Sequence, residues 1–226
     1  MNSERRAALA FAAILAAIFL PLAARASVIS VVNPSFEDPA GPYPFGCGTN
    51  CSYSGPPISG WTGTTDGYFI PTGYFNSVPD GKVIAYVNTG DISQTVSAVA
   101  HNGVTYTLLT DVGVRGDGYQ NLGVVDLIIG GNTVQATGTA ASNWQFSTYT
   151  ASYTATAADE GSSIAIALGT GPITCSNAPV CQAEFDNVRL SGSAGSVPEP
   201  AAWALILAGL GMTGAALRRR PAAMTA

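Results

Sequence analysis

The stretch Ile92-Ser-Gln-Thr-Val-Ser-Ala-Val-Ala-His-Asn-Gly-Val-Thr-Tyr-Thr-Leu-Leu-Thr-Asp-Val-Gly-Val114 decides the fold class of this chain. Residues 92–100 alternate with a period of two, which is typical of a strand with one face on a core. His101-Asn102-Gly103 has the composition of a tight turn, and residues 104–114 continue as a second strand. The stretch therefore predicts an antiparallel hairpin.

Short runs rich in β-branched residues continue on both sides of this stretch. They predict further strands at residues 28–32, 82–88, 124–129, 133–137, 144–156, 162–168 and 185–190. Two segments rich in Gly, Pro and aromatic residues, 38–57 and 67–80, are predicted as loops. Eight or nine short strands with regular turns indicate an all-β domain, an antiparallel jelly-roll β-sandwich over residues 27–192.

The predicted sandwich is acidic. Between residues 27 and 196 there are three basic residues, Lys82, Arg115 and Arg189, against twelve Asp and Glu. A negatively charged body repels the phosphate backbone, so nucleic acid is not an expected partner.

The N-terminus has the features of an export signal. Arg5 and Arg6 precede an apolar run over residues 7–24, and Ala24-Arg25-Ala26 has the small-x-small form of a cleavage site. We expect residues 1–26 to form a helical signal peptide that the secretion machinery removes. An uncleaved anchor is the alternative, and Pro21, just before the cleavage site, favours cleavage.

The C-terminus contains a second apolar segment. Residues 201–217 carry no charge, and as a helix they would extend about 25 Å, slightly less than the roughly 30 Å hydrocarbon core of a bilayer. The long side chains of the following arginines can cover the difference, and they mark the cytoplasmic side. We therefore predict a transmembrane helix at 201–217, after a linker at 193–197, with a short cytoplasmic end at 221–226. A core helix is the alternative.

This C-terminal end resembles the PEP-CTERM sorting signal of Gram-negative bacteria. The resemblance rests on Val197-Pro198-Glu199-Pro200, the apolar run, and the cluster Arg218, Arg219 and Arg220, in that order. It implies that a membrane enzyme of the exosortase type processes the chain near Pro198, Glu199 and Pro200. The body would be periplasmic while the helix anchors it to the inner membrane, and would then reach the cell surface or the extracellular space.

The four cysteines fall into two local pairs, Cys47 with Cys51 and Cys175 with Cys181. Export makes disulfide bonds possible, and an even count suits them. Three connectivities exist, and we favour the two local bonds. A zinc site is the alternative, although the spacings are unlike those of zinc knuckles and the chain has one histidine.

The body resembles galactose-binding-like jelly rolls, of which carbohydrate-binding modules are members. The matching pieces, in order, are Asn33-Pro-Ser-Phe-Glu37, Ile58-Ser-Gly-Trp61, Ile92-Ser-Gln-Thr95, Tyr106-Thr-Leu108 and Phe185-Asp-Asn-Val188. In carbohydrate-binding relatives, the Glu of the first piece and the Asp of the last hold a structural calcium ion. The resemblance therefore implies calcium at Glu37 and Asp186; the alternative is that both are solvated or bonded to loop amides.

Aromatic residues between glycines and prolines suggest a ligand-binding surface. Tyr68, Phe69, Tyr74 and Phe75 form one such group. Flat aromatic faces stack on sugar rings, so these residues are candidates for binding polysaccharide. The alternative is that the rings close the open end of the sandwich.

No catalytic pattern stands out. His101 lies in a predicted turn, and no nucleotide-binding motif is present. Loop carboxylates suited to a hydrolase, Asp66, Asp80, Asp111, Asp117 and Asp126, do not single out a pair. The sequence therefore predicts a protein that is not an enzyme. We expect an exported structural or adhesive protein associated with exopolysaccharide, with a carbohydrate-binding module of defined ligand as the alternative.

Overall fold

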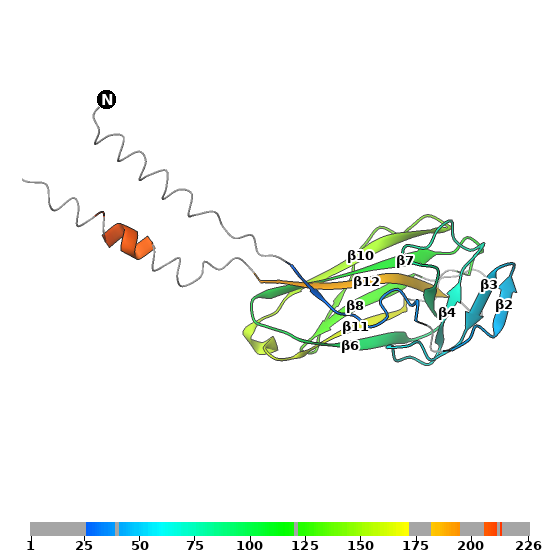
Figure 1. The fold of residues 1–226 in the computed structure, drawn as a ribbon, viewed down its shortest axis with the longest axis horizontal. Coiled ribbons are helices and arrows are strands. Elements are labelled where there is room, and N and C mark those ends of the chain that lie inside the picture. The colour runs from blue at the N-terminus through cyan, green and yellow to red at the C-terminus, as the bar shows by residue number, and fades with distance from the viewer. Residues whose placement is uncertain are drawn as a thin grey trace, which may run out of the picture. The chain divides into compact units, whose positions relative to one another are not determined.

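The structure is a computed structural model that describes residues 26–38, 41–119, 122–171, 182–194, 206–211 and 213. Residues 25–194 form one compact unit, the body, and residues 1–24 with 195–226 form a second unit. The body is built from two antiparallel sheets, which confirms the predicted all-β class (Figure 1). The finer jelly-roll assignment stays a prediction.

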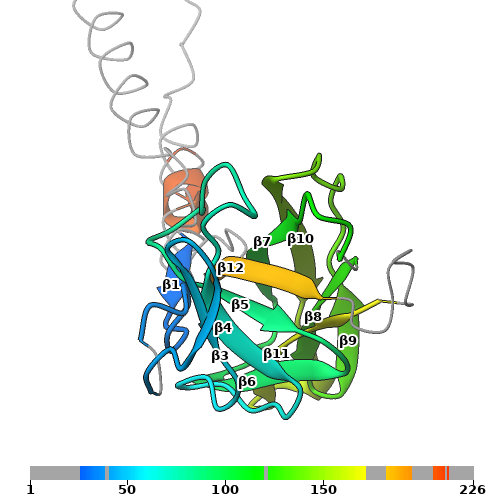
Figure 2. The ribbon, with the colours of Figure 1, turned by 90° about the vertical axis from the view of Figure 1, so that its right-hand side faces the viewer.

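The larger sheet contains eight strands in the described part of the chain, in the order β10-β7-β12-β5-β4-β3-β2, with β1 paired to β12. Figure 2 shows β12 between β7 and β5. Their bounds are β1 Ser27–Ile29, β2 Phe45–Gly48, β3 Cys51–Ser54, β4 Asp66–Ile70, β5 Ile84–Val87, β7 Val104–Val114, β10 Gln145–Thr154 and β12 Ala183–Ala194.

The smaller sheet has the order β6-β11-β8-β9 among the described residues. Its strands are β6 Asp91–Val99, β8 Gly123–Ile129, β9 Asn132–Gln135 and β11 Ser163–Thr170, and a short 3₁₀ helix, η1 Ala157–Asp159, precedes β11. Gly130 and Gly131 have φ angles of 58° and 84°, as a two-residue hairpin turn requires, and they join β8 to its partner β9.

The main core lies between the two sheets. It takes every second residue of the long strands, including Leu108 and Val112 from β7 and Ile164 and Ile166 from β11. A second apolar cluster contains Cys51, Phe69, Phe75, Ile84 and Tyr86. Because Phe69 and Ile84 alternate with core residues of the same strands, this cluster covers the other face of the larger sheet.

The predicted pairing of residues 92–100 with residues 104–114 is wrong. Both segments are strands, but β6 pairs with β11 in the smaller sheet and β7 pairs with β10 and β12 in the larger one. The turn between them crosses from sheet to sheet. Val104 N–H donates to His101 O within the turn, while Gly103 N–H donates to Ala155 O and Gly161 N–H donates to Ala100 O. Each of the two strands has one apolar face. When the strands belong to two facing sheets, both apolar faces are buried in the core between the sheets.

Three strands lie in segments that the sequence predicts as loops. β2 and β3 fall within residues 38–57, and β4 falls within 67–80 apart from its first residue. β4 is buried along four of its five residues, so it lacks the alternation of polar and apolar residues that marks a strand. These strands extend one side of the larger sheet (Figure 1).

The second unit contains helical residues at 206–211 and 213. In the part of the chain that the structure describes, no helix has the length and apolar character needed to cross a bilayer. The predicted helix at 201–217 therefore stays a prediction. The predicted signal helix at 1–26 lies outside the described residues, apart from Ala26.

Candidate functional site

A hollow of about 270 Å³ opens on the face of the larger sheet that carries the second apolar cluster. A second hollow adjoins it and shares Tyr74, Arg115 and Gln182. We call the first hollow the sheet pocket. It is lined by Cys47, Tyr53, Phe69, Tyr74, Tyr86, Asn88, Arg115 and Gln182. Four of these eight residues are aromatic, so half of the lining residues present flat rings.

Strand alternation and one glycine explain how these rings come together. On β4, Tyr68 points into the main core and its neighbour Phe69 points into the pocket. A Cβ at Gly67 would lie 2.1 Å from Ser54 O and 2.4 Å from the Tyr86 hydroxyl, so only glycine fits there. The close approach lets the Tyr86 hydroxyl donate to Ser54 O at 3.0 Å, which fixes one wall of the pocket.

A disulfide bond closes the hairpin of β2 and β3 beside the pocket. Cys47 and Cys51 are bonded, which confirms one of the two predicted pairs. The Tyr74 hydroxyl donates to Cys47 O at 3.1 Å and ties the hairpin to the loop after β4. The other predicted pair, Cys175 with Cys181, lies outside the described residues.

Arg115 is the cationic group of the pocket. Its Nε and Nη2 donate to the two carboxylate oxygens of Asp117 at 3.0 and 2.6 Å, and Nη1 donates to Gln182 Oε1. The guanidinium lies 4.5 Å from the ring centroid of Tyr74. Gln182 Nε2 in turn donates to Asn88 Oδ1 at 3.0 Å. A row of polar groups therefore crosses an aromatic wall.

Glu184 lies beneath Arg115. Its side chain is fully buried, and Oε1 is 3.7 Å from Arg115 Nη1, too far for a hydrogen bond. Among the described residues neither carboxyl oxygen has a hydrogen-bond partner. Burial raises the pKa of Glu184 well above its usual range; the Arg115 charge opposes this rise and the Asp117 charge adds to it. Burial therefore favours the neutral form of this carboxyl.

Tyr86 also faces the pocket and pairs with Glu184 across the sheet. Burial, with the nearby Tyr53 and Asp66, raises the pKa of Tyr86 to about 12. The Tyr86 hydroxyl therefore stays neutral at physiological pH and can only donate or accept hydrogen bonds.

The structure separates the predicted aromatic ligand residues. Phe69 and Tyr74 line the pocket, whereas Tyr68 is 1% exposed in the main core and its hydroxyl donates to Gly41 O at 2.8 Å. Phe75 packs on Phe146 with ring centroids 4.5 Å apart. Tyr68 is therefore unavailable to a ligand, because its position on β4 turns it inward.

Sequence reasoning missed the polar part of the site. Arg115 and Glu184 are distant in sequence, and β7 and β12 bring them together through their pairing. One signal was present: Arg115 is one of only three basic residues in a strongly acidic body. A lone cation in such a setting is expected to have acidic neighbours.

Glu37 and Asp186, the predicted calcium ligands, both contact the chain just before β5. Glu37 Oε1 accepts from the backbone N–H groups of Lys82 and Val83, each at 2.6 Å. Asp186 accepts from the N–H groups of Asp80 and Asn187 at 2.9 and 2.7 Å. Both carboxylates thus accept hydrogen bonds from backbone amides. Among the described residues, no group of three or more Asp, Glu, Cys or His side chains lies close enough together to hold a metal ion.

Asp186 is nevertheless unusual, because burial raises its pKa to about 8 and the charges of Asp80 and Asp111 add to the effect. A cation beside Asp186 would relieve this repulsion. Calcium at this position stays a prediction.

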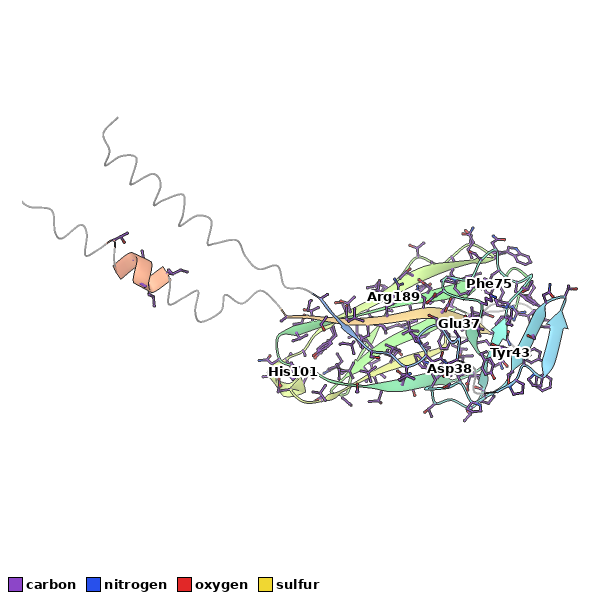
Figure 3. The ribbon with its side chains drawn as sticks, in the orientation of Figure 1. Glu37, Asp38, Tyr43, Phe75, His101 and Arg189 are labelled. Carbon is purple, nitrogen blue, oxygen red and sulfur yellow. A yellow bond between two sulfur atoms is a disulfide. The ribbon has the colours of Figure 1, made fainter. Side chains whose placement is uncertain are left out.

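His101 lies in a turn, as predicted, and is exposed. Its Nδ1 is 2.9 Å from Glu160 Oε1. Figure 3 places His101 at one end of the body, away from Tyr43 and Phe75. The single histidine thus takes no part in the sheet pocket.

The fold has solved relatives among cyclases. A cyclase from Fischerella sp. TAU is 24% identical, covers 76% of this chain and 100% of its own, and superposes with a TM-score of 0.62. The structure of a cyclase from the same organism in complex with 4-(1H-indol-3-yl)butan-2-one is 24% identical over 75% of this chain and 99% of its own, with a TM-score of 0.60. The CBM22-1 xylan-binding domain from Paenibacillus barcinonensis Xyn10C is 14% identical, covers 76% of this chain and 99% of its own, and has a TM-score of 0.42.

Two sequence families match the chain, while no curated protein does. The PEP-CTERM protein-sorting motif matches residues 196–220, which confirms the resemblance seen in Val197-Pro198-Glu199-Pro200 and Arg218 to Arg220. This motif implies that the protein is exported and sorted by exosortase.

The second family is that of the HpiC1 cyclase, whose profile matches residues 27–191. This match contradicts the expectation that the protein is not an enzyme. That expectation relied on motifs local in sequence, whereas the side chains that line the sheet pocket come from separate strands and loops. Since residues 27–191 make up most of the chain, the protein belongs to the HpiC1-like cyclase family.

Proposed function

We propose that this protein is an exported enzyme of the cyclase type that binds a compact aromatic molecule in the sheet pocket and uses Glu184 as its proton donor. The observation that carries the proposal is the position of Glu184. It is fully buried without a hydrogen-bond partner among the described residues, directly beside the pocket residues Arg115 and Tyr86. Perturbed acids beside an aromatic pocket are typical of active sites.

The pocket suits a flat ligand of about two fused rings. Its volume is about 270 Å³, and Tyr53, Phe69, Tyr74 and Tyr86 are half of its eight lining residues. Such walls bind aromatic ligands by stacked and edge-to-face contacts. Indole compounds were solved with the cyclase from Fischerella sp. TAU, which makes an indole a reasonable first probe.

The proposed chemistry is an isomerisation that consumes no reagent. The O–H bond of Glu184 breaks and its proton adds to an electron-rich carbon of the ligand, leaving a cation that the aromatic walls stabilise. A second π bond of the ligand attacks this cation and closes a ring. Loss of a proton from the product then returns Glu184 to its acid form. Because Arg115 covers Glu184, its guanidinium must shift when a ligand enters.

Calorimetric titration with 4-(1H-indol-3-yl)butan-2-one tests the binding part. We expect saturable binding by the wild type and an increase in Kd of about tenfold or more in Tyr74→Ala, since that wall is lost. Tyr149→Ala is the matched control, because Tyr149 lies on β10 and does not line the pocket. Equal affinities in all three proteins would place the ligand elsewhere.

A sugar is the second candidate ligand. The row formed by Asn88, Gln182, Arg115 and Asp117 offers amide and charged groups beside aromatic faces, as sugar hydroxyls require. This observation supports the exopolysaccharide role expected from the sequence. Retention on immobilised polysaccharide, lost in Tyr74→Ala and kept in Tyr149→Ala, would favour the sugar over the indole.

The processing of both ends completes the proposal. We expect the signal peptide to be cleaved after Ala26, and exosortase to cut near Pro198 to Pro200. Mass spectrometry of the protein isolated from its native host should give a chain that starts at Ser27 and ends close to Pro198. A chain retaining Met1 or Arg220 would contradict the corresponding cleavage.

A further inference from the structure

Trp144, the residue before β10, has a backbone conformation that is rare for a bulky side chain. Its φ angle is 71°, in the left-handed region that favours glycine and asparagine. Two backbone hydrogen bonds hold it there. Its N–H donates to Val114 O at 2.7 Å, and its carbonyl accepts from Asn76 N–H at 2.9 Å. An unfavourable conformation held by specific bonds points to a role for the residue.

The indole ring of Trp144 lies on the turn that carries Arg115 and Asp117. A Cβ added at Gly116 would stand 1.7 Å from Cε2 of the Trp144 ring. Only glycine at this position lets the ring sit so close to the backbone. The ring therefore rests against the peptide that joins the two charged residues of the pocket.

The carbonyl of Trp144 reaches a second pocket element. Asn76, which donates to it, follows Tyr74 and Phe75 in the loop after β4. Tyr74 in turn stacks on Arg115 at 4.5 Å, and its hydroxyl bonds to Cys47 O. Trp144 thus contacts both loops whose side chains meet in the sheet pocket, although it does not line the pocket itself.

We propose that Trp144 is a positioning residue that clamps the loop at residues 71–78 to the turn at residues 115–119 and thereby sets the spacing of Tyr74 and Arg115. The effect on ligand affinity rests on the function proposed above, while the clamp itself does not. A ligand that stacks on Tyr74 and contacts Arg115 needs these two groups at a fixed separation. Losing the ring leaves both residues in the chain and loosens their alignment.

A purely structural role predicts a different behaviour. Trp144 is 39% exposed and belongs to neither apolar cluster of the body. Removing it opens little of the core, so the melting temperature should change by only a few degrees. Affinity and loop protection should change much more than stability does.

The test compares Trp144→Asn with the wild type, because asparagine tolerates the left-handed backbone and removes the ring. We expect Kd for 4-(1H-indol-3-yl)butan-2-one to rise about tenfold or more. In the absence of ligand, hydrogen–deuterium exchange should become faster in residues 115–119, against which the ring packs, and stay unchanged in β6. Gly116→Ala, which keeps Trp144 and displaces its ring, should give the same pattern.

Val99→Asn is the control, since Val99 is similarly exposed, at 43%, and lies on β6 in the other sheet. Unchanged exchange in residues 115–119 of Trp144→Asn would overturn the proposal. So would a fall in melting temperature of about 10 °C or more, which would assign the ring to the stability of the body. If the wild type fails to bind the probe, the proposed function fails, and the exchange measurement still decides whether the clamp exists.

Discussion

Asp66, the first residue of β4, has a buried carboxyl group that lacks a full set of hydrogen-bond partners. It is 2% exposed, and its Oδ1 has no hydrogen-bond partner in the described part of the chain. Burial raises the pKa of Asp66 above the ordinary value of 3.8. The native protein therefore keeps this proton at a pH where the unfolded chain has lost it, so stability is lost as the pH rises above 3.8 toward the native pKa.

The Asp66→Asn variant should remove this pH dependence. Below pH 3.8 the two proteins differ only in side-chain chemistry, and above it the wild type should lose about 1.4 kcal/mol for each unit of upward pKa shift. The melting temperature of Asp66→Asn, relative to wild type, should therefore rise between pH 3.5 and 7. The exposed Asp91→Asn serves as control. A constant difference between Asp66→Asn and wild type would show that Asp66 titrates normally.

At the scale of elements, the sequence predicts the long strands well and the strands of the site badly. β7 matches its predicted range of 104–114, because it alternates over many residues and is bounded by turn signals. β2 and β3 are short and rich in Gly, Ser and Cys, and β4 is buried on both faces. Those three strands carry much of the pocket wall. An alternating pattern in the sequence reveals a strand that is buried on one face. It therefore misses β4, which is buried on both faces, and β2 and β3 are too short to show an alternation.

The disulfide-bonded hairpin offers a test of this wall. The double variant Cys47→Ser/Cys51→Ser lacks this bond. Because the loop is small, the chain-entropy relation predicts a decrease of about 2 kcal/mol in the free energy of unfolding. In the described part of the chain, the pairing of β3 with β4 joins this hairpin to the rest of the sheet, so we expect the loss to affect β2 and β3 most. We expect Kd for the indole probe to rise several-fold while the β6 and β8 amides keep their exchange protection. Loss of protection throughout the body would show that the hairpin supports the whole fold.

At the scale of the molecule, the sequence predicts the sorting motif correctly but not the enzyme family of the body. The motif could be identified because its three parts are contiguous in residues 196–220. The candidate site could not be identified, because Arg115 and Glu184 meet only when β7 pairs with β12. The search for local catalytic motifs led to the wrong expectation of a protein that is not an enzyme. A buried acid on a strand is invisible to a search for local motifs.

The predicted calcium site would join residues from separate elements of the body, and it can be tested by a stability measurement. If the ion binds between Glu37, on the loop after β1, and Asp186, on β12, calcium at about 100 times its Kd should stabilise the protein by about 2.7 kcal/mol. EDTA should reverse the rise in melting temperature. Glu37→Gln keeps a hydrogen-bond acceptor for Lys82 and Val83 and should abolish the calcium effect. Equal stability with calcium and with EDTA would contradict the prediction.

The most direct test of the central claim is acid catalysis by Glu184 on a bound indole. The rate at which 2-methylindole takes up deuterium at C3 from D₂O at neutral pD, measured by mass spectrometry, reports proton transfer to an electron-rich carbon. Once calorimetry has shown that the probe binds, we predict that the wild type accelerates the exchange over buffer and that Glu184→Gln slows it by about 100-fold or more. Equal rates with wild type and Glu184→Gln would contradict the account.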